Sequence, residues 1–133
     1  MRALRSLALV AATLVVAGCG GDSGGGTSAQ PGVIRLTLNT PNSGDGAILF
    51  KVTGVIDSVQ GGLMMQQGSY GTVTTFTRIV IAGDLIDGPV AYLFVPDVHD
   101  LGTYVATVEQ VAVKATNAQR SLAGYSIAAT VEP

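Results

Sequence analysis

From Gly32 onward, apolar and polar residues alternate in short runs that are separated by turn-forming residues. In Val33–Leu38, for example, every second residue is a large aliphatic one, and this period of two is typical of a half-buried β-strand. Clusters rich in Asn, Asp, Gly and Pro, such as residues 39–46, then reverse the chain. No run shows a convincing apolar stripe with the period of a helix. The pattern predicts an all-β domain: an antiparallel β-sandwich of seven to nine strands, with either an immunoglobulin-like or a jelly-roll topology.

The alternation places the expected strands at 33–38, 47–53, 55–60, 72–81, 90–95, 103–114 and 121–132. Turns are expected at 68–71 and 83–89, whereas 63–67 fits either a short edge strand or a loop. Both faces of run 90–95 are apolar, which indicates a central strand. The alternation in 103–114 changes phase near Glu109 and Gln110, which predicts a β-bulge. The core candidates from these runs are Ile48, Phe50, Val52, Ile79, Ile81, Tyr92, Phe94, Val105 and Ile127.

The first residues follow the plan of an export signal. A short basic start containing Arg2 and Arg5 precedes a mostly apolar run over residues 6–16. That run is too short to cross a hydrocarbon core as a helix, which takes about 20 residues. Two small residues then lead to Cys19, the only cysteine of the chain.

The sequence Val16-Ala17-Gly18-Cys19 resembles the bacterial lipobox. The resemblance implies that the Cys19 thiol takes a diacylglyceryl group and that signal peptidase II cuts before it. Cys19 then becomes the first mature residue and holds two or three fatty acyl chains such as palmitate, which together anchor a protein stably. Gly20, rather than aspartate, follows the cysteine, and in a host with two membranes this implies the outer membrane. The alternative is an ordinary signal peptide followed by a chance cysteine.

These features divide the chain into three parts. Residues 1–18 are the expected lipoprotein signal peptide, and residues 19–31 the lipidated cysteine with a flexible tether rich in Gly and Ser. Residues 32–133 are the expected β-sandwich domain, which is large enough to fold without disulfides or metal.

The charge of the expected mature chain limits its partners. All nine acidic residues remain after residue 18, but only five basic ones do, and these are not clustered. Nucleic acid is therefore not an expected partner. An anionic membrane surface would not attract such a domain either, so the lipid on Cys19 must hold it.

His99 is the only histidine and lies between Asp97 and Asp100 in a predicted loop. One interpretation is a general base or metal ligand positioned by a carboxylate, which would make the protein a hydrolase. The other is an ordinary polar loop, because a lone histidine lacks the three or four convergent ligands of a zinc site.

Three aspartates in turns, Asp45, Asp84 and Asp87, are candidate calcium ligands because calcium prefers several oxygen ligands. Their spacing does not match a calcium loop, and aspartate is common in turns for conformational reasons. Tyr70, in a glycine-flanked turn, is the best candidate for an exposed aromatic ligand contact, and the alternative is a packed loop anchor. No motif of a serine hydrolase, nucleotide-binding loop or zinc protease is present, so no cofactor and no enzymatic activity are expected.

The runs Gly46–Val52, Ile81–Leu85 and Val90–Pro96 resemble strands of cohesin-type β-sandwiches, which share their architecture with some carbohydrate-binding modules. The resemblance implies a jelly-roll-like sandwich that binds another protein. We therefore expect a lipid-anchored cell-envelope lipoprotein with a protein-binding or structural module. The alternative is a module that binds carbohydrate or another small ligand.

Overall fold

The computed structural model describes residues 27–62, 66–70 and 76–133, with the backbone alone for 66–70. The predicted signal peptide, Cys19 and most of the predicted tether lie outside these residues. In the described ranges, no helix is long and apolar enough to span a bilayer.

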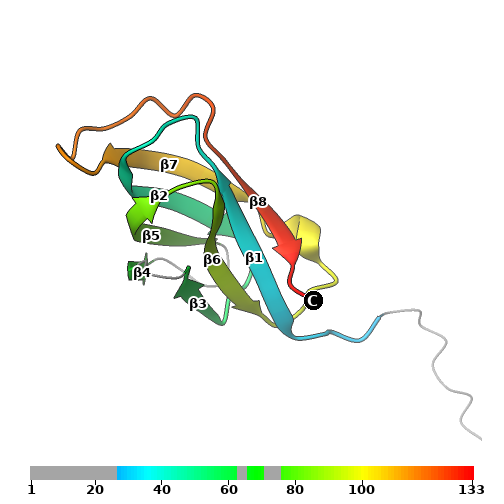
Figure 1. The fold of residues 1–133 in the computed structure, drawn as a ribbon. Helices are drawn as coiled ribbons and strands as arrows, with labels where there is room; N and C mark the ends of the chain where they lie inside the picture. The colour runs from blue at the N-terminus through cyan, green and yellow to red at the C-terminus, as the bar shows by residue number, and fades with distance from the viewer. Residues whose placement is uncertain (1–26, 63–65, 71–75) are drawn as a thin grey trace, which may run out of the picture.

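The described chain is an antiparallel β-sandwich with two four-stranded sheets (Figure 1). One sheet has the order β3-β6-β1-β8 and the other the order β4-β5-β2-β7. The strand bounds are β1 Gly32–Asn39, β2 Asp45–Thr53, β3 Ser58–Gly61, β4 Gln66–Tyr70, β5 Phe76–Leu85, β6 Gly88–Val95, β7 Ala106–Val113 and β8 Ser126–Val131. A single turn of 3-10 helix, η1, covers Leu101–Thr103. The predicted all-β fold is thus confirmed, with a strand number inside the expected range.

The strands pair in a nested order. The first pairs with the last, β1 with β8, and the series continues inward as β2 with β7, β3 with β6 and β4 with β5. The pairs β1–β6 and β2–β5 then complete the two sheets. A long hairpin rolled into two sheets gives this order, which is closer to a jelly roll than to the immunoglobulin scheme of consecutive paired strands.

The inner faces of the two sheets share one hydrophobic core. Its members alternate along the strands, as the period of two predicts. Of the predicted core residues, Ile48, Phe50, Val52, Ile79 and Ile81 are at most 1% exposed. The remaining fully buried large side chains are Ile34, Leu36, Leu38, Leu85, Val90, Leu93, Val95 and Val111.

The other predicted core residues are less buried. Phe94 is 39% and Val105 54% exposed, and Tyr92 is only partly buried, so these three assignments were wrong. Val105 precedes β7 and lies outside the sheet. Ile127 is partly buried and packs against the core from the edge strand β8.

A β-bulge explains the misassigned face of β6. Leu36 of β1 pairs with Ala91, but Thr37 pairs with Pro89, so Val90 is an extra residue. Val90 and Ala91 are consequently both buried, and the inward positions continue through Leu93 and Val95. Because both parities of this run are apolar, the sequence alternation alone could not show which face points inward.

The predicted bulge in β7 is present. Leu49 of β2 pairs with Gln110 and Phe50 with Val108, which leaves Glu109 as the extra residue. The expected turn at 68–71 was wrong over 68–70, because these residues belong to β4, which extends to Tyr70. β5 likewise continues to Leu85 and narrows the second expected turn.

Candidate functional site

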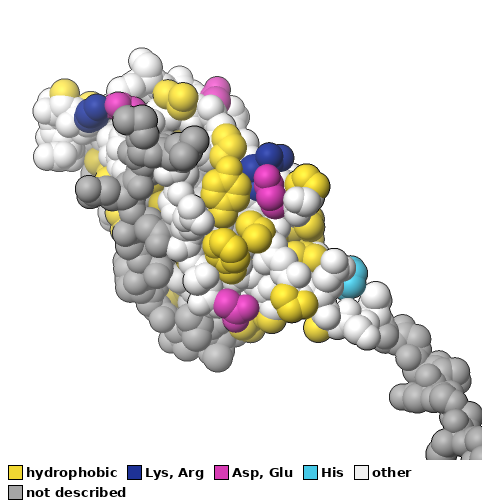
Figure 2. Space-filling model, turned by 60° about the horizontal axis from the view of Figure 1, so that its bottom comes forward, with side chains coloured by type: hydrophobic (Ala, Val, Ile, Leu, Met, Phe, Trp, Pro, Cys, Tyr) yellow, Lys and Arg dark blue, Asp and Glu magenta, His cyan; other side chains and the backbone are white. Residues whose placement is uncertain are grey.

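The outer face of the β3-β6-β1-β8 sheet presents two aromatic side chains, Tyr92 and Phe94. They lie two residues apart on the outward positions of β6, which is an inner strand of its sheet. Val33 and Arg35 of β1 lie directly opposite Phe94 and Tyr92, with Ser58 and Gln60 opposite them on β3. We call these six residues the aromatic face. Figure 2 shows hydrophobic side chains gathered in a stripe here, with a basic and an acidic side chain beside them.

An ion pair borders the aromatic face. Arg35 Nη1 lies 3.5 Å from Glu132 Oε2, and the two side chains are 38% and 34% exposed. Arg35 Nε and Glu132 Oε2 are nevertheless buried atoms that have no hydrogen-bond partner in the described part of the chain. Because both atoms are buried, only the exposed remainder of these two side chains is available for hydrogen bonds to another molecule next to Tyr92.

The outer face of the opposite sheet is hollowed over β2, β5 and β7. The hollow has a volume of about 320 Å³, and its floor consists of the aliphatic side chains of Ala47, Leu49, Val80 and Ala112. Val111 and three carboxamide residues, Gln110, Asn117 and Gln119, complete its lining. We call this hollow the carboxamide depression. Its volume lies near the lower end of the range for small-ligand sites.

Charged groups lie beside the depression but do not line it. Arg78 and Lys51 pair one row beyond Val80 and Leu49, on the same outer face. Arg78 Nε donates to Glu109 Oε2 over 2.8 Å, and this hydrogen bond holds the pKa of Glu109 below its usual value. The guanidinium of Arg78 also lies 4.9 Å from the centre of the Phe76 ring. Arg78 is thus paired with Glu109 and with the Phe76 ring beside the depression.

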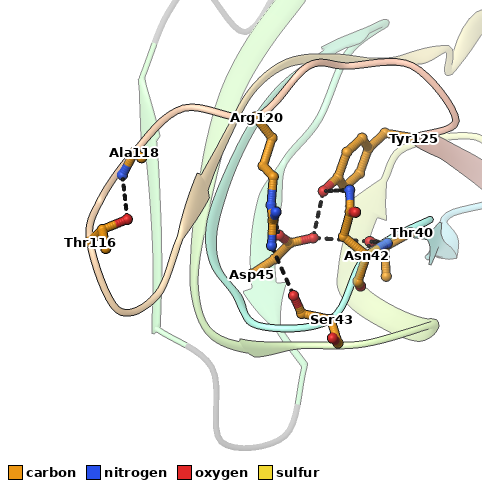
Figure 3. A network of polar contacts seen from close by, with 8 residues as sticks. All are labelled: Thr40, Asn42, Ser43, Asp45, Thr116, Ala118, Arg120 and Tyr125. Carbon is orange, nitrogen blue, oxygen red and sulfur yellow. Dashed lines mark hydrogen bonds and ion pairs between the residues drawn. The ribbon is translucent and has the colours of Figure 1, made fainter.

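A polar cluster around Asp45 ties two loops together (Figure 3). Asp45 is 1% exposed, and Arg120, Tyr125 and Thr40 donate hydrogen bonds to its carboxylate over 2.9, 2.7 and 2.9 Å. Arg120 also donates to the Ser43 carbonyl oxygen over 2.9 Å. We call these residues the Asp45 cluster.

The cluster determines the ionisation of Asp45. Burial alone would raise the pKa of this carboxyl, but the hydrogen bonds from Tyr125, Arg120 and Thr40 outweigh burial and lower the pKa below its ordinary value. Asp45 is therefore ionised at neutral pH and paired with Arg120. This arrangement is that of a structural ion pair, in which every carboxylate oxygen is already occupied.

The other two calcium candidates are also engaged in contacts within the protein. Asp84 accepts a hydrogen bond from the Lys114 ammonium group. Asp87 accepts one from the Thr40 backbone N–H over 2.7 Å. Among the described residues, no group of three or more His, Cys, Asp and Glu is arranged to hold a metal ion. Asp45, Asp84 and Asp87 are thus not brought together as a calcium site in this structure.

His99 lies at the surface beside Asp97. Its Nδ1 is 3.3 Å from Asp97 Oδ1, and its side chain is 43% exposed. Backbone N–H groups of His99 and Gln30 donate to the same oxygen and lower the pKa of Asp97. Val98 N in turn donates to the Gln30 carbonyl oxygen over 2.8 Å. This loop therefore fastens the chain that precedes β1, a structural role that the sequence did not reveal.

The two remaining predicted site residues are less defined. The backbone of Tyr70 pairs with that of Arg78 at the end of β4, and the Tyr70 side chain lies outside the described atoms. Cys19 lies outside the described residues.

Sequence reasoning missed both surfaces and the Asp45 cluster. Gln110 lies at the predicted bulge and Asn117 between two predicted strands, but nothing in the sequence placed them side by side. Arg120 lies 75 residues from Asp45, so their pairing depends on β2 meeting β7.

Comparisons with protein-family models, with curated proteins and with solved structures found no match to this chain.

Proposed function

We propose that this protein is a lipid-anchored, non-enzymatic module of the cell envelope that binds another protein through its aromatic face. The observation that carries the proposal is the outward position of Tyr92 and Phe94 on an inner strand, with Phe94 39% exposed. Clustered exposed apolar side chains are typical of interaction sites. Tyr and Arg, present here as Tyr92 and Arg35, are also the residue types most enriched at binding hot spots.

The partner's chemistry follows from this surface. The six residues lie on one face of an extended sheet, which suits a protein surface that buries both rings and hydrogen-bonds with the Arg35 and Glu132 groups. Truncation of a hot-spot aromatic costs about 2 kcal/mol or more, which corresponds to roughly 30-fold in dissociation constant.

The lipobox-like sequence at Cys19 supports the anchor. Because hydrogen bonds hold Gln30 to the 97–99 loop, the free tether would comprise residues 20–29. Ten residues rich in Gly and Ser have a root-mean-square span of about 17 Å, which would separate the domain from the lipid headgroups. With Gly20 after the cysteine, the expected destination in a host with two membranes is the outer membrane.

The anchor is tested with Cys19→Ser. Serine supplies no thiol, so the variant should carry no acyl mass and should remain uncleaved by signal peptidase II. Mass spectrometry of the membrane fraction measures both. A wild-type mature protein that begins elsewhere than Cys19, or carries no lipid, contradicts the anchor.

The binding face is tested by photocrosslinking in living host cells. A photoreactive amino acid at Phe94 should give a discrete adduct with one envelope protein, and Tyr92→Ser should weaken that adduct. The control position is Leu122, which is 38% exposed and lies in a loop away from this face. Equal adducts at both positions, or none at Phe94, would refute the proposed face, and a protein–protein adduct of twice the chain mass would identify a second copy as the partner.

A further inference from the structure

We propose that the carboxamide depression is a second binding site, for a single uncharged pyranose sugar. It lies on the β4-β5-β2-β7 sheet, whereas the aromatic face lies on the other sheet, so the two sites are independent. Three features of this depression favour a sugar: its apolar floor, the neutral hydrogen-bonding groups at its rim, and the backbone contacts that hold the rim in place.

The floor offers an apolar surface of limited size. Ala47 and Ala112 pair directly across β2 and β7, and Leu49 pairs with Val80 across β2 and β5. The two short alanine side chains leave the hollow, and Val80 remains 36% exposed within it. The apolar C–H face of a sugar ring can pack on such a floor and remove aliphatic surface from water.

The rim offers neutral hydrogen-bonding groups. The side chains of Gln110, Asn117 and Gln119 line the hollow, and none of the three makes a hydrogen bond within the described structure. A carboxamide supplies both donors and an acceptor, which suits hydroxyl groups that also donate and accept. Among the described residues, no charged side chain lines the hollow, so these residues provide no counter-ion for an acidic or basic ligand.

The rim is held in place before a ligand arrives. Residues 117–120 fold back along β7: Val113 N donates to the Ala118 carbonyl oxygen and Arg120 N to that of Val111, each over 2.8 Å. Asn117 adopts a left-handed backbone with φ of 57°, which aspartate and asparagine tolerate best among non-glycine residues. Behind the rim, the Arg120 guanidinium is fixed by Asp45. Such preorganisation lowers the entropic cost of binding.

The same segment favours a sugar over a peptide. An extended peptide gains most of its affinity by pairing its main chain with a free strand edge. Beside the depression, that edge of β7 is already occupied, because Ala112 forms a β-bridge with Gln119. Recognition therefore falls to the side-chain carboxamides and the aliphatic floor. A volume of about 320 Å³ suits one sugar ring rather than a chain of them.

The test is saturation-transfer NMR on the protein purified from membranes in a detergent without sugar headgroups. The probes are glucose, galactose and N-acetylglucosamine, with glucuronate as the charged counterpart of glucose and N-acetyl-alanine amide as the peptide probe. At least one neutral sugar should give a saturable signal with a dissociation constant on the order of 1 mM, and glucuronate should bind more weakly.

Two variants locate the site. Gln110→Ala should weaken sugar binding roughly three- to tenfold, since it removes one or two hydrogen bonds. Gln60→Ala removes a carboxamide from the aromatic face instead and should leave sugar binding unchanged. Equal thermal unfolding midpoints would confirm that both variants remain folded.

Several outcomes overturn the proposal. They are the lack of saturable binding by any neutral sugar, equal binding by Gln110→Ala and the wild type, and preference for glucuronate or for the peptide probe. None of these outcomes bears on the photocrosslinking at Phe94, so the two sites succeed or fail separately.

Discussion

Replacement of Asp45 by asparagine should destabilise the domain far more than the same replacement at Asp84. Both aspartates pair with a basic side chain, but Asp45 has a fully buried side chain and Asp84 one that is 79% exposed. The Asp45 carboxylate accepts three hydrogen bonds, and bonds to a charged group contribute about 1.5–3 kcal/mol each when a partner is lost.

The expected loss in free energy of unfolding depends on the contacts that asparagine retains. Its carbonyl oxygen can still accept from Arg120, but its NH₂ group faces the hydroxyls of Tyr125 and Thr40 without a charge. Removal of one partner of a fully buried ion pair costs about 3–5 kcal/mol, and because Arg120 keeps 28% exposure we expect about 2–4 kcal/mol. Asp84→Asn should cost less than about 1 kcal/mol, as exposed pairs do.

The assay is denaturant unfolding of wild type and both variants at pH 7, with equal m-values required for the comparison. A double-mutant cycle with Arg120→Gln should show a coupling energy of about 1 kcal/mol or more between Asp45 and Arg120, because asparagine removes the charge of the pair. Similar small losses for Asp45→Asn and Asp84→Asn would refute the reasoning, because they would mean that the buried cluster contributes no more than a surface pair.

The same experiment has a pH dependence with a defined sign. The folded pKa of Asp45 is lower than its unfolded value, so its stabilisation is complete above about pH 4–5 and is lost as the pH falls through the folded pKa. Asparagine cannot be protonated in this way. The stability difference between wild type and Asp45→Asn should therefore narrow on acidification, and a constant difference down to acid pH would contradict the assigned ionisation.

Three further stability measurements test the fold. Leu93→Ala should cost about 2–5 kcal/mol because Leu93 is fully buried, whereas Phe94→Ala, on the outward position, should cost about 1 kcal/mol or less, and equal losses would mean that the face of β6 is misassigned. Tyr125→Phe should cost about 1.5–3 kcal/mol in denaturant unfolding, because it removes a donor to a buried carboxylate. Gly54→Ala should lower the thermal midpoint more than Gly44→Ala does: both glycines have positive φ, but a Cβ at Gly54 would lie 2.8 Å from a tyrosine ring, and one at Gly44 meets nothing within 4 Å.

The period of two predicted the fold class and most of the strands because each run has one buried face. Where both faces of a run are apolar, the pattern does not show which face is buried. In Val90–Val95 both parities are apolar, and the bulge at Val90 changes the phase, so Phe94 was placed inward although it points outward. The bulge at Glu109 could be predicted because a polar pair interrupts an otherwise regular run.

The surfaces were harder to predict because they depend on which strands become neighbours. The carboxamide depression requires β7 beside β2 and the 117–120 segment folded over that edge. Asp45 appeared in the sequence only as a turn aspartate, and its role follows from Arg120 and Tyr125, which lie far along the chain. Local patterns carry no information about such long-range neighbours until the strand order is known.

The position of β1 determines how the domain bears mechanical load. β1 is an inner strand, held by β6 on one side and β8 on the other, and the chain that precedes it leaves from one end (Figure 1). Tension along this leading chain pulls β1 lengthwise, so the hydrogen bonds to both neighbours are strained in shear and together. A strand pulled at right angles to its length would instead open one bond at a time. If the proposed anchor holds the protein by this chain, loading in shear should raise its resistance to forced unfolding, which depends on the unfolding rate and not on equilibrium stability.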